Sequence, residues 1–489
     1  MSLANNLPGW DVSTVDQGPE GLPKTVGELK VSGYQFRSVK EELRQNLFDR
    51  LKSDQVIFPG IVGYDQSVIP QLINGLLARH DLLFLGLRGQ AKTRLLRALP
   101  HLLDEYIPTL EGQELLDNPL APALKSGQAL VEQLGDDAPI RWVHRSQRYH
   151  EKLATPDVTI ADLIGEIDLV KHAEGKYLSD ETTMHFGLVP RTNRGIFAIN
   201  ELPDLAPRIQ VGLFNVLEER DVQIRGYPVR LPLDLLMVFS ANPEDYTNRG
   251  RIVTPLKDRI GTVIRTHYPQ TVKEAMVITT SNAYLQRDGA LDLSIPPFMH
   301  EVVEQVVRLA RKSPHINQAS GVSVRTSIAT AELMVSNAER RGIINAETQI
   351  VPRICDLAHI SAGCRGKIEL MLAEEDGAED KLVFTLLGEA VKDVFEKYAD
   401  LDDYEDLIEQ FRGGANFQVG DEISSETLVA SLNQIKGLKS ASTQLCRTLE
   451  LNPKQPAELA CAAELLLEAL YVNNQLSKYV YKGQTHYKK

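Results

Sequence analysis

The chain has 489 residues, of which 43% are hydrophobic and 24% charged, an ordinary globular composition with room for about three domains. Its 53 Lys and Arg residues against 66 Asp and Glu residues give a net charge of −13, which disfavours sequence-independent binding of nucleic acid. There is no apolar run of about 18 residues, no basic and apolar leader, and no paired spacing of the four cysteines. We therefore expect a cytoplasmic protein with neither a membrane span nor a signal peptide.

Four segments follow one another along the chain. Residues 1–33 are rich in Gly, Pro, Asp and Ser and are expected to form an extended or disordered arm. Residues 34–269 alternate short apolar segments with helical patterns, which predicts an α/β fold with a parallel sheet covered by helices. Residues 270–370 show helical spacing, and for residues 371–489 we expect an acidic linker, a helical extension and a frayed tail. The predicted strands lie at 82–85, 142–143, 196–199, 235–240 and 263–264.

The sequence GLRGQAKT directly follows the first predicted strand and precedes a helix. A phosphate-binding loop needs inward-facing backbone N–H groups, which Gly86 and Gly89 permit, and the helix N-terminus adds partial positive charge. Lys92 is placed to bind the β- and γ-phosphates of ATP, and the Thr93 hydroxyl to bind Mg²⁺. Ala91 stands where glycine usually precedes the lysine. An alanine at this position costs little conformational energy if its backbone is already helical. The segment predicts a site for ATP and Mg²⁺.

Two further predicted strands end in polar side chains. IFAINEL places Asn200 and Glu201 after a buried strand, and MVFSANPED places Asn242 after another. Because ligands bind at the carboxyl edge of open α/β sheets, Glu201 and Asn242 are candidates to orient the attacking water. Asn200 occupies the position where an aspartate is expected in the Mg²⁺ shell. An amide brings no negative charge there, so we expect weaker organisation of Mg²⁺ and slow turnover.

The order of these motifs resembles that of the AAA+ ATPases, and within them the MoxR and magnesium chelatase I-subunit group. The resemblance covers about residues 36–365. ATPDVTIADLIGEIDL resembles the stretch before the group's helix-2 insertion, and VQIRGYPVRLPLDL resembles its hairpin before sensor 1. The motifs that carry the resemblance are GLRGQAKT, FGLVPRTNRGIFAINELPDL, VFSANPED, PLKDRIG and SVRTS.

The resemblance implies a role for each matched residue. Asn242 would be sensor 1, Arg259 the arginine finger, Arg325 sensor 2, and Gly63 would lie beside the adenine. From the sequence alone, Arg249 or Arg251 could also be the finger. The resemblance also implies a nucleotide-binding domain over 34–269 and a helical lid over 270–370. The nucleotide would be bound by Gly63, Gly86, Arg88, Gly89, Gln90, Ala91, Lys92 and Thr93, and Mg²⁺ by Thr93 and Asn200.

The implied function is an ATP hydrolase that self-associates into a ring, in this superfamily usually a hexamer, and remodels or matures a von Willebrand factor A-domain protein. Two alternatives stay open: a magnesium chelatase subunit driving metal insertion into a porphyrin, and a nucleotide-gated assembly module with little hydrolysis. The sequence shows no helix-turn-helix signal near the C-terminus, so a transcriptional activator is not supported. The basic, aromatic segment 141–150 is interpreted as a loop at a subunit interface or pore rather than a nucleic-acid site. The histidines at 144, 150, 172 and 185 lack zinc-ligand spacing.

Overall fold

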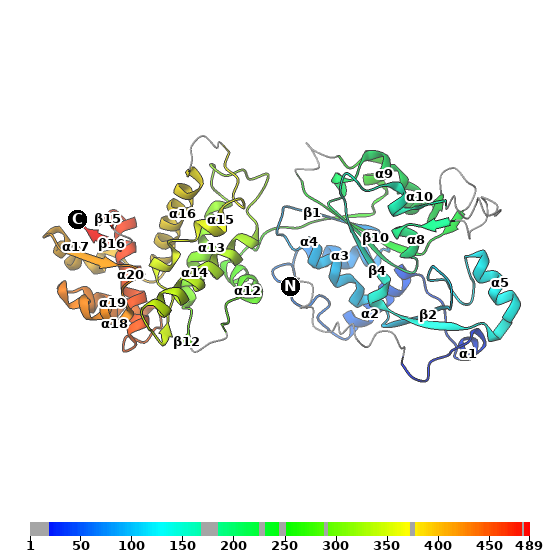
Figure 1. The fold of residues 1–489 in the computed structure, drawn as a ribbon, viewed down its shortest axis with the longest axis horizontal. Coiled ribbons are helices and arrows are strands. Elements are labelled where there is room, and N and C mark those ends of the chain that lie inside the picture. Colours follow the sequence, from blue (N-terminus) through cyan, green and yellow to red (C-terminus); the bar gives the residue numbers. More distant parts are fainter. Residues whose placement is uncertain are drawn as a thin grey trace. The chain divides into compact units, whose positions relative to one another are not determined.

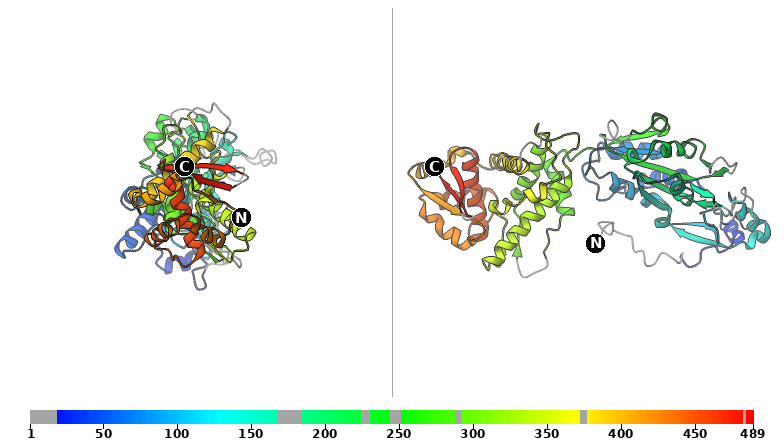
Figure 2. Two further views of the ribbon diagram at one scale, coloured as in Figure 1. Left: turned by 90° about the vertical axis from the view of Figure 1, so that its left-hand side faces the viewer. Right: turned by 45° about the horizontal axis from the view of Figure 1, so that its top comes forward.

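A computed structural model describes residues 19–167, 184–223, 230–243, 251–287, 292–371, 377–481 and 484–489. The chain divides into two units, of which the first holds residues up to Gly86 and Ala91–His267, and the second holds Leu87–Gln90 and Tyr268–Lys489. The first unit is a sheet between helices and the second is mainly helical (Figures 1 and 2). Among the described residues, no helix combines the length and the apolar character needed to cross a bilayer.

The first unit is built around a five-stranded sheet with the order β11-β1-β10-β7-β4. Every pair of neighbouring strands in this sheet is parallel. Strands β7 and β10 are buried along their whole length, as expected for parallel strands that are covered on both faces. The predicted α/β fold with a parallel sheet is confirmed. The strands are β1 (Leu82–Leu85), β4 (Tyr149–Leu153), β7 (Gly195–Asn200), β10 (Leu235–Ala241) and β11 (Thr262–Arg265).

Helices cover both faces of this sheet because successive strand residues point to opposite sides. In β7, Ile196 and Ala198 pack into one apolar cluster, and Phe197 and Ile199 pack into the other. The first cluster is completed by α2 (Val39–Lys52), α3 (Val68–Leu77) and α4 (Lys92–Ala98). The second is completed by α9 (Pro207–Gly212), α10 (Phe214–Glu218) and α11 (Thr254–Arg259).

The edge of the sheet differs from the sequence prediction. The predicted strand at 142–143 is part of β3 (Ile140–His144), which pairs antiparallel with β2 (Tyr106–Leu110) in a separate sheet. The main sheet ends instead in β4, which begins at the end of the segment that was interpreted as a basic loop. Its sequence YHEKL has no apolar pattern, so pairing with β7 rather than local propensity makes it a strand. The preceding Arg148 is 1% exposed and donates to both carboxylate oxygens of Glu42 at 2.7 and 2.6 Å, which makes it a core residue.

The expected N-terminal arm is helical in part. Residues 1–18 lie outside the described residues, but α1 (Val26–Val31) begins after Thr25, whose side chain accepts from the Glu28 N–H. Val26 and Leu29 are buried against β2 and β3. The prediction of an extended or disordered arm is therefore wrong for residues 26–31, because two apolar residues three apart suffice for one buried helical face when a partner surface exists.

Two antiparallel strand pairs lie in the regions that the resemblance relates to the helix-2 insertion and to the hairpin before sensor 1. β5 (Gly165–Ile167) pairs antiparallel with β6 (Met184–Phe186), and β8 (Asp221–Gln223) with β9 (Arg230–Pro232). The residues between them, 168–183 and 224–229, lie outside the described residues. The unit's other helices are α5 (Lys125–Leu134), α6 (Ile160–Leu163) and α8 (Leu188–Arg191).

The second unit has one apolar core that joins the expected lid to the expected C-terminal extension. Phe298, Val335, Val391 and Leu466 belong to the same cluster, so the described residues of the two regions form one packed body. The acidic stretch after residue 376 is largely α16, which buries its apolar face in this core. The helices are α12 (Val272–Asn282), α13 (Pro297–Ala310), α14 (Val324–Ile344), α15 (Ser361–Cys364), α16 (Ala378–Phe395), α17 (Glu405–Arg412), α18 (Ser425–Ser431), α19 (Leu438–Thr448) and α20 (Pro456–Val472).

The C-terminal tail is a β-hairpin and not a frayed end. β15 (Ser477–Tyr481) and β16 (Gln484–Lys488) pair antiparallel, and β16 also pairs with β14 (Asn416–Val419). Tyr487 is 2% exposed and donates its hydroxyl to Glu468 of α20, which ties the tail to the core. A pair of two-residue strands, β12 (Asp292–Leu293) and β13 (Gln349–Ile350), completes the unit.

One buried carboxyl group gives the first unit a pH-dependent stability. Asp234 accepts from the Val39 N–H at 3.0 Å, and burial raises its pKa to about 6. Its unfolded pKa is about 4, so the folded state binds more protons between these values and this group's contribution to stability falls as pH rises through them. As pH rises from 4 to 6, the free energy of unfolding of Asp234→Asn should increase relative to that of the wild type by about 1 to 3 kcal/mol. Urea unfolding at a series of pH values measures this difference.

The control is Asp162, whose pKa is lowered by hydrogen bonds from the backbone N–H and the hydroxyl of Thr159. The stability that Asp162 adds is lost as pH falls, so Asp162→Asn should show a trend of opposite sign. The same trend in both variants would contradict the assignment for Asp234.

Candidate active site

The phosphate-loop sequence joins the end of β1 to the start of α4, as predicted. Gly86 donates its N–H to the Ala241 carbonyl at 3.1 Å, and α4 begins at Lys92. Gly89 has φ +75°, and a Cβ atom there would lie 2.2 Å from Ser323 Oγ. Both the backbone angle and the close approach therefore require glycine at this position.

Ala91 does not have the helical geometry under which alanine would cost little. It precedes α4 in the left-handed region, at φ 54° and ψ 16°. A side chain in this region costs about 1 to 2 kcal/mol, which explains why glycine is usual at this position. The chain therefore holds a strained residue directly before the lysine.

Lys92, Asn242 and Glu201 are brought together by three neighbouring strands. The Lys92 ammonium donates to Asn242 Oδ1 at 2.6 Å and to the Gly86 carbonyl. Asn242 in turn donates from Nδ2 to Glu201 Oε2 at 2.9 Å. Because β1, β10 and β7 are adjacent and parallel, their carboxyl ends meet at one edge. A cation, an amide and a carboxylate are thus placed side by side where a phosphate group can bind.

Glu201 is held in an unusual backbone conformation. It lies at φ 54° and ψ 49°, immediately after β7, and its N–H donates to Ser240 Oγ at 3.2 Å. Side chains other than glycine seldom adopt this region, and such strain concentrates at functional positions. The turn directs the Glu201 carboxylate to Asn242 rather than along the strand.

Asn200 has a carboxylate partner that sequence reasoning missed. Its Oδ1 accepts from Ser240 Oγ at 3.0 Å, and its Nδ2 donates to Glu151 of β4. Glu151 also accepts from Arg97 Nε at 2.8 Å and from the Tyr149 hydroxyl at 3.0 Å. Because 141–150 was interpreted as a loop, no strand end was expected beside Asn200. The available signal was Glu151 itself, an acidic residue directly after this short polar segment.

The candidate arginines have different surroundings. Arg259, at the end of α11, donates to Glu218 Oε2 at 2.7 Å and to the Pro255 carbonyl at 2.9 Å, and it lies over the Phe214 ring. Arg251 is exposed, whereas Arg249 lies outside the described residues. Arg325 is the second residue of α14 in the second unit, where its N–H donates to Ser323 Oγ at 3.1 Å.

The remaining predicted nucleotide-binding residues are distributed over both units. Gly63 lies before α3 with φ 78°, and Thr93 is exposed at the second position of α4. Arg88 binds Glu369 Oε1 at 2.8 Å, and its carbonyl accepts from the Tyr268 hydroxyl at 3.0 Å. Gln90 is buried. Roles for these residues toward a nucleotide remain predictions.

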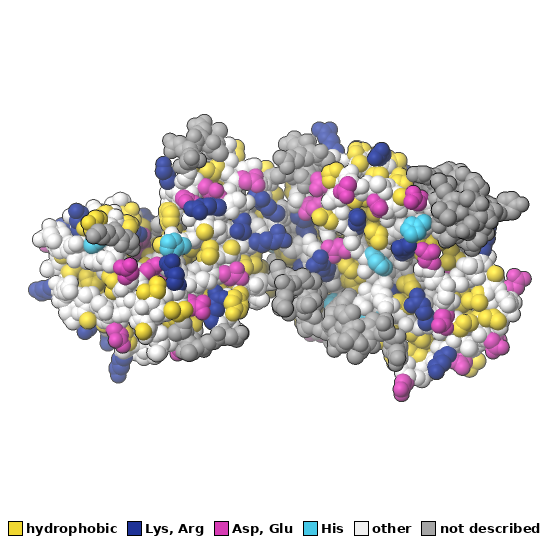
Figure 3. All heavy atoms as spheres, viewed as in Figure 1, with side chains coloured by type: hydrophobic (Ala, Val, Ile, Leu, Met, Phe, Trp, Pro, Cys, Tyr) yellow, Lys and Arg dark blue, Asp and Glu magenta, His cyan; other side chains and the backbone are white. Residues whose placement is uncertain are grey.

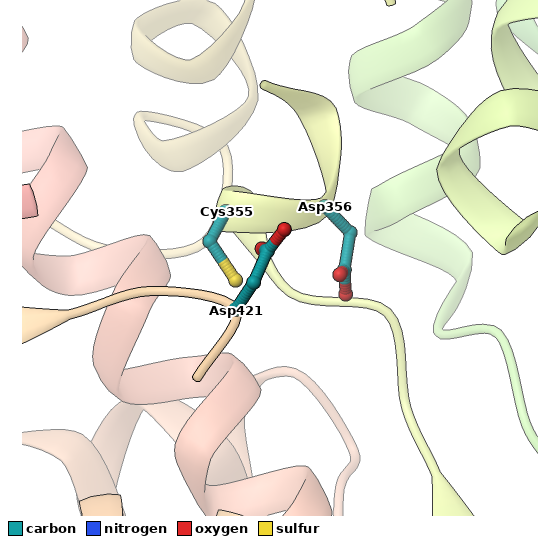
Figure 4. A group of neighbouring side chains, drawn as sticks. All are labelled: Cys355, Asp356 and Asp421. Carbon is teal, nitrogen blue, oxygen red and sulfur yellow. The ribbon is translucent and has the colours of Figure 1, made fainter. Parts of the chain in front are cut away.

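A group of side chains in the second unit has the spacing of metal ligands but the surroundings of an ion-pair network. Potential ligand atoms of Cys355, Asp356 and Asp421 lie within 4.8 Å of one another (Figure 4). Asp356 accepts from Arg341 at 3.1 Å, and Asp421 is bound by Arg340. Burial raises the pKa of the Cys355 thiol well above its usual value. Asp356 thus neutralises the buried Arg341, and Asp421 pairs with the half-exposed Arg340.

Two of the histidines named in the sequence analysis contact hydroxyl groups, and His172 lies outside the described residues. His144 contacts Ser146 Oγ at 2.8 Å, and His150 contacts Thr192 Oγ1 at 3.1 Å. On the face shown in Figure 3, acidic and basic side chains occur together on the described parts of each unit.

Residues 138–263 match the family model of the sigma-54 interaction domain, an AAA+ domain. These residues therefore belong to an AAA+ domain. The matched range covers the AAA+ strands β4, β7 and β10, with Glu201 and Asn242, and it confirms the resemblance at the level of the superfamily.

Individual proteins match the chain over limited lengths. A stretch of 106 residues is 31% identical to the hydrogenase transcriptional regulatory protein HoxA of Cupriavidus necator, covering 21% of this chain and 22% of that protein. NtrX from Brucella abortus in complex with ADP is 13% identical, with a TM-score of 0.31, over 63% of this chain and 52% of NtrX. A model of the magnesium chelatase BchI–BchD complex is 18% identical, with a TM-score of 0.34, over 66% of this chain and 98% of that one. The chain thus spans about a fifth of HoxA and about half of NtrX.

The strain at Ala91 leads to a stability prediction. Ala91→Gly relieves the left-handed alanine but adds freedom to the unfolded chain, so it should raise the free energy of unfolding by about 0.5 to 1 kcal/mol. Ala129→Gly, at an exposed position inside α5, should lower it by about 1 kcal/mol. Urea unfolding without nucleotide measures both. Equal destabilisation by the two changes would show that Ala91 is unstrained.

Proposed function

We propose that this chain is a Mg·ATP-dependent ATPase of the MoxR and magnesium chelatase I-subunit group, which assembles into a ring and remodels a partner protein. The observation that carries the proposal is the hydrogen-bonded series Lys92–Asn242–Glu201 at the carboxyl edge of the sheet. The motifs along residues 36–365 support the group.

The side chains fit a division of labour in γ-phosphoryl transfer. Lys92, released from Asn242 when ATP binds, compensates charge on the β- and γ-phosphates. Glu201 then accepts a proton from the attacking water, and the Asn242 amide holds that water in line. Asn242 already contacts both residues, so a displacement of its side chain would release both of them together.

The donors available at this edge suit Mg²⁺. The ion prefers oxygen ligands and is usually held by one or two protein groups together with phosphate oxygens and water. The Thr93 hydroxyl and the Asn200 amide oxygen are of this kind. When bound, the ion would offset the charge that develops on the phosphates. Thr93 and Asn200 would anchor it, directly or through water.

Arg259 is proposed to complete the nucleotide site of a neighbouring subunit. A guanidinium stabilises the charge on the γ-phosphate oxygens and cannot lose its proton. Contacts with Glu218 and Phe214 hold its side chain in a defined orientation at the end of α11. A site shared in this head-to-tail way closes into a ring, for which we propose a hexamer. We also propose a von Willebrand factor A-domain protein as the partner, and a cytoplasmic location.

Other functions are favoured by single observations. Asn200 favours a nucleotide-gated assembly module with little hydrolysis, and the resemblance to the chelatase group favours metal insertion into a porphyrin. The match of residues 138–263 favours activation of sigma-54-dependent transcription. Purification with ATP and identification of the bound partner distinguish these: a von Willebrand factor A-domain protein supports the main proposal, and RNA polymerase with sigma-54 replaces it.

Hydrolysis is tested by ATP turnover. Glu201→Gln should lower the rate by about 10²-fold or more, because the amide cannot accept the proton of the water, while ATP binding persists. Lys92→Ala should abolish binding itself. Glu132→Gln, which removes an exposed charge from α5, serves as the control. A wild-type rate no higher than that of Glu201→Gln would favour the assembly module.

Action of Arg259 between subunits is tested by mixing two inactive variants. Glu201→Gln and Arg259→Ala each inactivate one side of a shared site, so random mixing at equal amounts should restore intact sites and about a quarter of the wild-type rate. Arg251→Ala replaces Arg259→Ala in a parallel experiment. No recovery with Arg259→Ala, together with recovery with Arg251→Ala, would move the finger to Arg251.

A further inference from the structure

We propose that Glu151 is a positioning residue for Asn200 and supplies, from the neighbouring strand β4, the negative charge that an asparagine at the end of β7 lacks. This inference rests on the proposed Mg·ATP site. It concerns how the chain compensates for its departure from the aspartate that is expected at position 200.

The register of the two strands places the carboxylate correctly. β4 and β7 are parallel, with Glu151 opposite Ala198 and Leu153 opposite Asn200. Since strand residues alternate between faces, Ala198, Asn200 and Glu151 all point to the same side of the sheet. Ala198 packs there with residues of α4, the helix that carries Lys92 and Thr93. Glu151 therefore lies on the side of the sheet where the nucleotide helix packs.

The hydrogen bonds fix the direction in which the Asn200 amide points. Glu151, as a carboxylate, can only accept, so the amide must turn its Nδ2 toward it. On the other side the Glu201 N–H donates to Ser240 Oγ, which leaves the Ser240 proton for Asn200 Oδ1. Both partners require the same orientation. The amide oxygen keeps a second lone pair and would thereby be the Asn200 atom available to Mg²⁺ or to a water molecule on it.

The remaining partners of Glu151 tie this charge to the nucleotide helix. Arg97, one helical turn beyond Thr93, donates to both Glu151 oxygens at 2.8 and 3.1 Å. The Glu151 side chain is 18% exposed and that of Arg97 is 44% exposed. Water therefore screens the Arg97 guanidinium more than the Glu151 carboxylate. Part of the negative charge of Glu151 therefore still acts on Asn200. The buried end of the pair faces the amide.

The test measures how strongly Mg²⁺ and ATP assist each other's binding. The dissociation constant of ATP is determined by calorimetry with the full chain, once with excess Mg²⁺ and once with EDTA, and the ratio of the two values is the Mg²⁺ coupling. Glu151→Gln keeps an acceptor oxygen but removes the charge. It should reduce the coupling about tenfold without weakening ATP binding in EDTA.

Exchanging the two side chains separates a charge effect from damage to the fold. The double variant Glu151→Gln with Asn200→Asp restores one carboxylate and one amide in swapped positions, and its coupling should return to within about threefold of wild type. Glu132→Gln is the matched control for loss of one charge.

Each outcome decides the inference. Reduced coupling in Glu151→Gln with recovery in the double variant supports it. Coupling in Glu151→Gln equal to that in Glu132→Gln, or a double variant no better than Glu151→Gln, overturns it. ATP binding by the wild type that is the same with Mg²⁺ and EDTA overturns the inference while ATP binding by the proposed site stands. A wild type that binds no ATP in either condition overturns both.

Discussion

The hydrogen bond between the Lys92 ammonium and the Asn242 amide is the contact on which the candidate site depends. It joins the first residue of α4 to the end of β10, and through Asn242 it reaches Glu201 at the end of β7. Lys92 and Asn242 are 150 positions apart along the chain, and Asn242 and Glu201 are 41 positions apart. Their meeting therefore follows from the parallel order of β1, β10 and β7, which brings carboxyl ends to one edge. A sheet with another strand order would hold the same residues without making a site.

Charge at this edge is distributed over neighbouring strands rather than concentrated on one. Glu201 is connected to Lys92 through the Asn242 amide, and Glu151 is connected to Arg97 directly. Each carboxylate near the proposed metal position thus has a cation nearby, which limits the repulsion between them without a bound ion. Asn200 lies between the two groups and contacts Glu151 and Ser240. Its neutrality lets it serve as a donor to one side and an acceptor to the other, which an aspartate could not do.

Sequence reasoning predicted those parts of the fold that are determined by local pattern. The buried strands with continuous apolar runs, the glycine-rich turn after β1 and the polar residues that follow β7 and β10 are all present. The parts it missed depend on partners distant in sequence. β4 is a strand because β7 pairs with it, α1 is a helix because β2 and β3 cover Val26 and Leu29, and the tail is ordered because α20 binds Tyr487. Glu151 was missed for the same reason as β4.

Backbone strain shows which positions are set by more than the fold. Among the described residues, most non-glycine residues with positive φ directly follow helices, as Arg79 follows α3 and Asn474 follows α20, a common way to end a helix. Ala91 and Glu201 differ because they precede helices, each at the turn after a central strand. No helix termination requires the left-handed region there. The strain is held by the buried strands on one side and serves to aim the Lys92 ammonium and the Glu201 carboxylate at the same amide, which is the arrangement that a phosphate group would meet on arrival.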